Sequence, residues 1–287
     1  GLVKLDAIYE FQTASIKPKA EQIDYIKEFC QNLKSESLYV ALKIPTLPSS
    51  ITVDSIKNKI TKKNLFGIGI YKDDLEIAVY NFKKNYASII SSFDFDLFDG
   101  FIDALIEEIS SKLDLTVVDT KEIVEKSDKY TYINNNFDNF VKQLNDLIDK
   151  QTTIYRNNNY DTSSLDGEND KIYIISGFGT FYNRLSQDMQ KTFENLLVKG
   201  IETDKNYFIL LDTADQFKTF EYSEWYKKAV TKNSGIWIGS GINEQSIIKV
   251  MRVGNIAKKE IPNGFGFVVK QGTAKYTKLL EGEKDEQ

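Results

Sequence analysis

The sequence predicts an α/β fold in three layers, with a mostly parallel sheet between two layers of helices. Short runs rich in β-branched and aromatic residues recur along the chain, and stretches with helical apolar spacing lie between many of them. Several runs are apolar throughout, as in strands that are buried on both faces. The expected strands are 65–70, 75–82, 86–91, 115–119, 130–133, 171–176, 207–212, 235–239 and 265–269, and the expected helices are 100–112, 134–150, 181–199, 220–231 and 243–251.

The composition is that of an ordinary globular protein, and it excludes several kinds of chemistry. The 287 residues are 41% hydrophobic and 28% charged, with a net charge of −5, which allows one large domain or two small ones. The absence of histidine excludes Ser-His-Asp and Cys-His catalysis and any His-ligated metal site. The acidic balance, with Arg156, Arg184 and Arg252 as the only arginines, argues against a nucleic-acid partner.

The N-terminal segment predicts a strand and a helix. A strand-like stretch, 8–16, precedes Pro18, which suits the first turn of a helix over 17–34. The single cysteine, Cys30, falls on the apolar side of this helix, so we expect a small buried side chain rather than a reactive thiol. Its apolar neighbours at helical spacing are Ile23, Ile26, Phe29 and Leu33. One cysteine allows no internal disulfide, which fits a reducing compartment.

Proline and polar segments suggest where the chain divides. Pro45 and Pro48 lie in the segment 43–56, which we expect to be an extended connector, and 156–171 has the Asn, Asp and Ser content of a surface loop. The expected parts are an N-terminal part packing on the core at 1–60, the core domain at 61–280 and a disordered tail at 281–287.

Nothing in the sequence predicts a membrane span. No apolar run reaches the roughly 18–20 residues that a span needs, and no signal peptide opens the chain. Because the first residue is Gly rather than Met, we expect a piece of a longer protein. A membrane anchor of that protein would lie outside this sequence.

The stretch 86–109 has the layout of a nucleotide site without its chemistry. An apolar strand ends at Ser91 and Ser92, and a short turn leads into an amphipathic helix, as in a phosphate-binding loop. The turn SFDFDLFD lacks the glycines, the lysine and the Ser/Thr of such a loop. We therefore weigh an unusual nucleotide loop against a loop that its own apolar side chains close, and the charge favours the second. The apolar side chains are Phe93, Phe95, Leu97 and Phe98, and the acids are Asp94, Asp96 and Asp99.

Other strand ends carry polar residues that could face the same crevice, since ligands of α/β sheets bind at the carboxyl ends of the strands. Ser176 ends the strand 171–176, where a phosphate-binding enzyme has a magnesium-organising aspartate. A serine cannot supply that charge. Asp119 and Asp212 also end strands, but no nucleophile or base accompanies them, so capping or turn roles are expected.

In their order and spacing, these segments resemble the FtsK/SpoIIIE class of RecA-like ATPases. More closely, they resemble the C-terminal, third ATPase-like module of EssC-type coupling proteins of type VIIb secretion, over nearly the whole chain. LPSSITVDSI resembles the linker before each module, and NLFGIGIYKDDLEIAVYNFKKNYASII resembles the strand pair that leads to the phosphate-binding loop. After LDLTVVDTKEIV comes a helix that ends in an arginine, here Arg156. KIYIISGFGTF holds the Walker B position and IPNGFGFVV the final Gly-Arg-Gly strand.

The departures from this family's motifs concern every nucleotide-binding position. In the Walker A slot, which begins at Ser91 and Ser92, the lysine position holds Phe98 and the Ser/Thr position holds Asp99. In the Walker B slot the aspartate position holds Ser176, and the following acid is replaced by Gly179 or Thr180. The Gly-Arg-Gly element reads Gly264, Phe265, Gly266. We expect no catalytic residue, no metal site and no cofactor in this domain.

The resemblance implies a membrane-anchored parent protein that works on the cytoplasmic side of the membrane. It implies tandem modules, of which the sister modules use ATP and Mg²⁺, a hexameric parent, and small helical WXG-type proteins as secreted substrates. A RecA-like P-loop NTPase fold is implied as well.

Three hypotheses follow for the function. The first is a non-hydrolysing module of a type VII coupling ATPase that recognises substrates or transmits assembly signals. The second is a nucleotide-binding module whose unconventional loop is completed by a neighbouring module. The third is a structural module for oligomerisation. The sequence names neither the substrate nor its groove.

Overall fold

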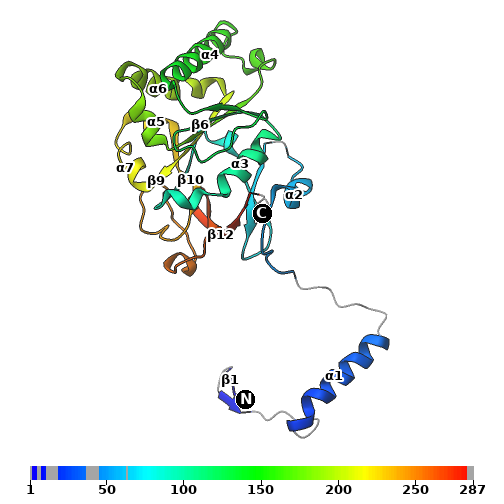
Figure 1. Ribbon diagram of the computed structural model, residues 1–287. Coiled ribbons are helices and arrows are strands. Elements are labelled where there is room, and N and C mark those ends of the chain that lie inside the picture. The colour runs from blue at the N-terminus through cyan, green and yellow to red at the C-terminus, as the bar shows by residue number, and fades with distance from the viewer. Residues whose placement is uncertain (1, 5–7, 11–18, 37–44, 63, 283–287) are drawn as a thin grey trace. The chain divides into compact units, whose positions relative to one another are not determined.

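The computed structural model describes residues 2–4, 8–10, 19–36, 45–62 and 64–282 and divides the chain into two compact units (Figure 1). The first unit is Gly1–Thr46 and the second is Leu47–Gln287. The division falls earlier in the chain than the predicted boundary at residue 60.

The first unit contains an antiparallel strand pair and one helix. The strands are β1 (Leu2–Lys4) and β2 (Ile8–Glu10), and the helix is α1 (Lys19–Glu36). Cys30 is exposed, so the prediction of a buried cysteine is wrong. Ile23 and Phe29, 64% and 52% exposed, lie uncovered with it. The physical reason is size, because the described part of this unit, two strands of three residues and one helix, provides too little apolar surface for a core.

The second unit is built on a ten-stranded sheet with the order β4-β3-β12-β11-β10-β5-β9-β8-β6-β7. Strands β10, β5, β9, β8, β6 and β7 are parallel to one another, and the remaining neighbours pair antiparallel. The bounds are β3 Phe66–Tyr71, β4 Ile77–Tyr80, β5 Ala87–Ser92, β6 Asp114–Asp119, β7 Thr131–Ile133, β8 Lys171–Ser176, β9 Asn206–Thr213, β10 Val230–Ile238, β11 Phe265–Lys270 and β12 Thr273–Leu279.

Helices cover both faces of the sheet, which completes the predicted three-layer α/β fold (Figure 1). Side chains of successive strand residues alternate between two apolar clusters, so that Ile89 packs with α4–α8 and Ile90 with α2 and α3. The helices are α2 Val53–Ile56, α3 Phe101–Ser110, α4 Phe137–Asn157, α5 Phe178–Arg184, α6 Gln187–Lys199, α7 Ala214–Lys218 and α8 Glu224–Ala229. Short 3₁₀ helices occupy Lys57–Lys59, Phe82–Lys84, Phe95–Phe98, Thr162–Leu165, Gly200–Thr203 and Asn255–Lys258.

Three of the predicted helices need correction. The stretch 220–231 is helical only over α8, because β10 begins at Val230. The stretch 181–199 is two helices, because Leu185 adopts an extended backbone between α5 and α6. The stretch 243–251 is not helical. There the Gln245 side chain bonds the backbone, donating to Ile242 O and Ile248 O at 3.0 and 2.8 Å and accepting from Ile248 N at 2.7 Å. These bonds take the place of a helical ladder.

The start and the end of the second unit are joined by main-chain hydrogen bonds. Ile51 is buried in the core, Ile51 O accepts from Glu281 N at 2.9 Å, and Gly100 O accepts from Gly282 N at 2.8 Å. The predicted connector therefore ends at α2, which belongs to the core, and the ordered chain reaches Gly282 within the predicted tail. Residues 283–287 lie outside the described residues. Within the described part of the chain, no helix has the length and apolar character to cross a membrane.

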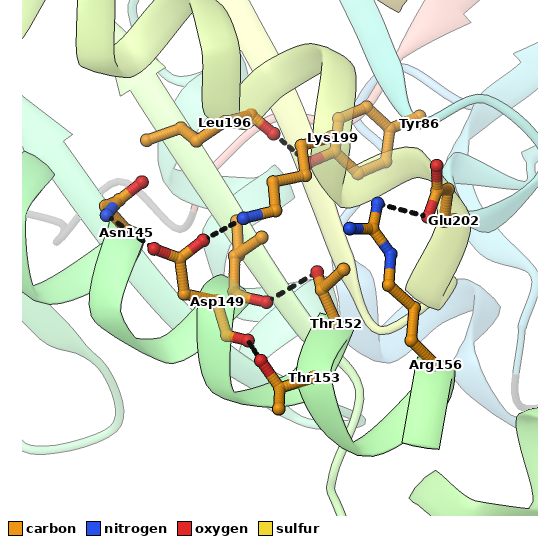
Figure 2. A network of polar contacts seen from close by, with 10 residues as sticks. Tyr86, Asn145, Asp149, Thr152, Thr153, Arg156, Leu196, Lys199 and Glu202 are labelled. Atoms are coloured by element: carbon orange, nitrogen blue, oxygen red, sulfur yellow. Dashed lines mark hydrogen bonds and ion pairs between the residues drawn. The ribbon is translucent and has the colours of Figure 1, made fainter. Parts of the chain in front are cut away.

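Ion pairs tie α4 to α6 and to the 3₁₀ helix that follows α6 (Figure 2). The Lys199 ammonium binds Asp149, and the Arg156 guanidinium, the arginine at the end of the predicted helix, lies 3.2 Å from Glu202 Oε2. Both partners of the Arg156 pair are about half exposed, at 48% and 46% of the side chain. Exposed pairs of this kind contribute little to stability, so they orient the helices on a core that apolar burial holds together.

Candidate functional site

The carboxyl ends of four neighbouring strands bring most of the predicted site residues to one edge of the sheet. In the strand register Ser91 of β5 lies opposite Asp212 of β9, and Asp119 of β6 lies opposite Ser176 of β8. We call this edge, together with the loop 93–100, the strand-end crevice. It is the place where α/β proteins bind ligands.

The loop after β5 satisfies its own backbone. Asp94 Oδ1 accepts from Asp96 N at 3.1 Å, Leu97 N donates to Asp94 O at 3.3 Å, and Asp99 N donates to Asp96 O at 3.3 Å. The Ser92 hydroxyl donates to Asp94 O. In a phosphate-binding loop such N–H groups point at the ligand. Here three of them, those of Asp96, Leu97 and Asp99, are bonded within the loop.

Apolar side chains fill the space beside this loop. Phe98 is fully buried, and the Phe95 ring lies 5.1 Å from it in an edge-to-face contact. The Phe93 ring meets Trp237 of β10 edge-on at 4.9 Å. Leu97 covers Gly239, where an added Cβ would come within 2.7 Å of Leu97 Cδ1. The four apolar residues thus close the loop, as the second interpretation of this stretch predicts.

Asp119 has the turn role that the sequence predicts. Its carboxylate is fully buried and accepts from the N–H groups of Lys121, Glu122 and Val124 at 3.0, 3.0 and 2.9 Å. The Tyr132 hydroxyl donates to Asp119 Oδ2 at 3.4 Å, and burial together with the Asp119 charge raises the pKa of Tyr132 to about 12. With its oxygens occupied in this way, Asp119 fixes the turn after β6.

The Asp212 carboxylate also accepts hydrogen bonds from backbone N–H groups, and its pKa is raised. Its Oδ2 accepts from Gly179 N at 2.7 Å and its Oδ1 from Thr213 N at 2.8 Å. Burial, which disfavours the charged carboxylate, raises the pKa of Asp212, and these two bonds and the Lys121 charge oppose that rise. The carboxylate therefore holds the first turn of α5 against the end of β9.

This pKa predicts a pH dependence of stability. An acid whose pKa is raised by folding binds more protons in the folded than in the unfolded chain at pH values just above the ordinary 3.8. The stability that it contributes is therefore present at lower pH and is lost as the pH rises through the folded pKa. We expect Asp212→Asn to flatten this fall in urea unfolding measured across pH 3.5 to about 6. Asp188→Asn at an exposed position of α6 is the control, and superimposable profiles for Asp212→Asn and the parent chain contradict the prediction.

A lysine that no sequence pattern singles out also lies at the crevice. The Lys121 ammonium is 5.3 Å from the centre of the Phe95 ring, and the side chain covers Gly177, where an added Cβ would come within 3.1 Å of Lys121 Cγ. The strand order places the end of β6 beside β8, and this brings Lys121 near the slot. Its position just past a strand end is the one signal in the sequence that could have found it.

The side chain at the aspartate position of the predicted Walker B slot is buried and uncharged, and the Asp212 carboxylate bonds Gly179 N in the same slot. Ser176 is fully buried, and within the described residues its hydroxyl and that of Ser91 have no hydrogen-bond partner. Thr120 N and Thr120 Oγ1 donate to Ser176 O at 3.2 and 3.0 Å. Gly179 is buried beneath the Gln216 side chain, and Thr180 follows it, partly exposed, on α5.

The third predicted slot lies on β11, with β10 between it and β5. Gly264 has φ 76°, and Gly266 is needed for close packing, because an added Cβ would lie 2.3 Å from Trp237 O. The ring of Phe265 stacks on Tyr276 of β12 at 5.2 Å. The side chain at the arginine position thus contributes to packing between strands.

Negative charge surrounds the first turn of α3. Burial, together with the charges of Asp99, Glu125 and Asp119, raises the pKa of Asp103. A polyphosphate at this position would face these carboxylates, and like charges at close range disfavour its binding.

Comparison with known proteins finds similarity in structure. No protein-family profile and no curated protein matches the chain. The cytoplasmic domain of EssC has a TM-score of 0.68 and 16% identity, covering 99% of this chain and 58% of that one. EssC (ATPases 2 and 3) from Geobacillus thermodenitrificans has a TM-score of 0.71 and 14% identity, covering 93% and 51%. Thermomonospora curvata EccC (ATPases 2 and 3), solved with a signal sequence peptide, has a TM-score of 0.61 and 12% identity, covering 93% and 50%.

The chain thus spans between half and three fifths of the length of these structures. The resemblance in the sequence is confirmed at the level of the fold. The chain has the RecA-like α/β fold of the EssC and EccC cytoplasmic ATPase domains.

Proposed function

We propose that this chain is a module of a type VII secretion motor that does not hydrolyse ATP and acts by binding secretion substrates. The fold shared with EssC and EccC supports the class of motor. The observation that carries the non-hydrolysing role is the loop after β5, where the N–H groups of Asp96, Leu97 and Asp99 bond within the loop and Phe98 is fully buried at the lysine position.

Three further features support the absence of hydrolysis. The buried Ser176 supplies no charge for Mg²⁺, Phe265 stacks on Tyr276 where the family has an arginine, and carboxylates surround the first turn of α3. Hydrolysis needs positive charge at the phosphates and an acid to hold the metal. In this crevice the lysine and aspartate positions hold Phe98 and Ser176, and neither side chain carries a charge.

The substrate side of the proposal rests on the relatives. The EccC structure was solved in complex with a signal sequence peptide, and we propose that this chain likewise binds a segment of a secreted, helical WXG-type protein. We further propose that its parent is anchored at the cytoplasmic side of the membrane, with neighbouring ATPase modules and a hexameric assembly.

Isothermal titration with Mg-ATP tests the proposed lack of nucleotide chemistry. We expect no saturable heat, whereas a related module with an intact Walker A motif, titrated under the same conditions, should bind. Micromolar binding, or turnover that is lost in Asp119→Asn or Asp212→Asn, would contradict the proposal. Pull-downs with secreted proteins then test recognition, and self-association without substrate binding would point instead to a scaffolding module.

A second candidate is a nucleotide site that a neighbouring module completes, and Lys121 favours it. The ammonium of this lysine lies beside the slot loop and supplies positive charge from β6. The titration should then be repeated in the presence of the neighbouring module. Nucleotide binding that appears only there, and that Lys121→Ala removes, would support this candidate over the first.

A further inference from the structure

A cavity with a mixed polar and apolar lining lies at the opposite end of the parallel strands from the strand-end crevice, and its residues Lys84, Asn233, Lys270 and Gln271 are exposed. It has a volume of about 500 Å³ and is formed where β5 begins, where β4 ends and where the β11–β12 hairpin turns. This volume is within the range of small-molecule sites, roughly 300–1,000 Å³. Its polar lining consists mainly of Asn81, Lys84, Asn85, Asn233, Lys270 and Gln271, and no carboxylate lines it.

The two lysines of this cavity have no acidic partner. Within the described residues Lys84 forms no ion pair, and the Lys270 ammonium donates to the neutral Tyr71 hydroxyl at 3.1 Å. The adjacent Lys83, by contrast, binds Asp170. Burial and the charges of Lys275 and Lys84 lower the pKa of Lys270. The two lysines repel each other across the cavity. Their positive charge is uncompensated there, although the chain as a whole has a net charge of −5.

The amide side chains add donors to the same cavity. Asn81 Oδ1 already accepts from Lys83 N at 3.0 Å, and Asn233 Oδ1 accepts from the Ser234 hydroxyl at 3.4 Å. Within the described part of the chain, the amide NH₂ groups of Asn81, Asn233 and Gln271 have no protein acceptor. A ligand that offers several acceptor oxygens would satisfy these donors.

The backbone holds these donors in place. Gly272 N donates to Asn233 O at 2.7 Å, and Gln271 N donates to Ser234 Oγ at 3.3 Å, so the hairpin turn is fixed to β10. The register between β10 and β5 shifts between Val230 and Gly235, which places Asn233 and Ser234 in the irregular part of the strand. Irregularities of this kind re-aim side chains and are common next to binding sites.

We propose that this cavity binds a small dianion, a phosphate or a dicarboxylate, through Lys84, Lys270 and the surrounding amides. The two ammonium groups match two negative charges, and the unpaired NH₂ groups match the remaining oxygens. The site is independent of the strand-end crevice, so it stands whether or not that crevice binds nucleotide.

The test is a titration of the whole chain with inorganic phosphate and, separately, with succinate at low ionic strength. We expect saturable one-site binding of at least one probe, and the tighter probe identifies the class of ligand. In Lys84→Met/Lys270→Met the affinity should fall by about tenfold or more, because both charge-assisted contacts are lost. The control Lys228→Met/Lys258→Met makes the same change of net charge at exposed positions and should stay within about twofold of the parent chain.

Thermal unfolding distinguishes a variant that has lost anion binding from one that does not fold. Without added anion, Lys84→Met/Lys270→Met should unfold at the same temperature as the parent chain or higher, because a repulsion is removed. The effective probe should raise the unfolding temperature of the parent chain and of the control, and leave the double variant unchanged. The proposal is overturned if neither probe shows saturable binding, or if the folded double variant binds the probe with the same affinity as the parent chain.

Discussion

Replacing Phe98 with lysine is expected to unfold the larger unit rather than to restore a nucleotide site. Phe98 is fully buried in the cluster beneath α3 and contacts Phe95 at 5.1 Å. The change removes a buried ring and introduces an unpaired charge, which together should lower the free energy of unfolding by about 4 kcal/mol or more. Urea denaturation followed by circular dichroism measures this loss.

The matched control is Phe93→Lys in the same loop. Phe93 is 43% exposed and meets Trp237 only at its edge, so the loss should be about 1 kcal/mol. A Phe98→Lys chain that keeps the parent stability and gains Mg-ATP binding would show the loop to be a nucleotide loop that lacks only its lysine.

Glu108→Ala is expected to cost the larger unit about 3–5 kcal/mol of unfolding free energy, because it breaks a buried ion pair from one side. Glu108 Oε1 accepts from the Lys112 ammonium at 2.6 Å and from Gly67 N at 2.7 Å, and its side chain is fully buried. The truncation leaves Gly67 N without its acceptor and the Lys112 ammonium without its carboxylate, so that this ammonium keeps Leu65 O, at 3.0 Å, as its acceptor.

Two variants refine this measurement. Glu108→Gln keeps an acceptor for Gly67 N and removes the charge, so its loss in urea unfolding should be intermediate. Glu107→Ala, at the partly exposed neighbouring position, should change the free energy by less than about 0.5 kcal/mol. Equal losses for Glu107→Ala and Glu108→Ala would rule out the ion pair as the cause.

The regular elements with strong local signals were predictable. The strand β8 has the predicted bounds because its apolar residues are continuous and a polar loop and a glycine flank it. β12 was missed because its sequence TAKYTKL alternates lysine and threonine with apolar residues, and the sheet provides the apolar neighbours. The prediction of a helix at 243–251 was wrong because Ile247 and Ile248 are buried by a loop, which the Gln245 side chain stabilises.

The candidate site likewise has features that were predictable from the sequence and features that were not. The closing of the slot loop was predictable because its aromatic residues are adjacent in sequence, and a local segment determines their packing. The position of Lys121 was not predictable from the sequence, because it depends on β6 lying beside β8 in the sheet. The donor-rich cavity depends even more on tertiary structure. Lys84 and Lys270 are about 180 residues apart in the sequence, and only the strand order brings them together.

The hydrogen bonds that join the start and the end of the larger unit have a mechanical consequence. Ile51 O accepts from Glu281 N, and Ser49 O accepts from the Lys278 ammonium, so the two ends of this unit are held side by side. A pulling force applied between residues 49 and 281 is therefore carried first across this short clamp. These contacts must break before the two ends of the unit can separate.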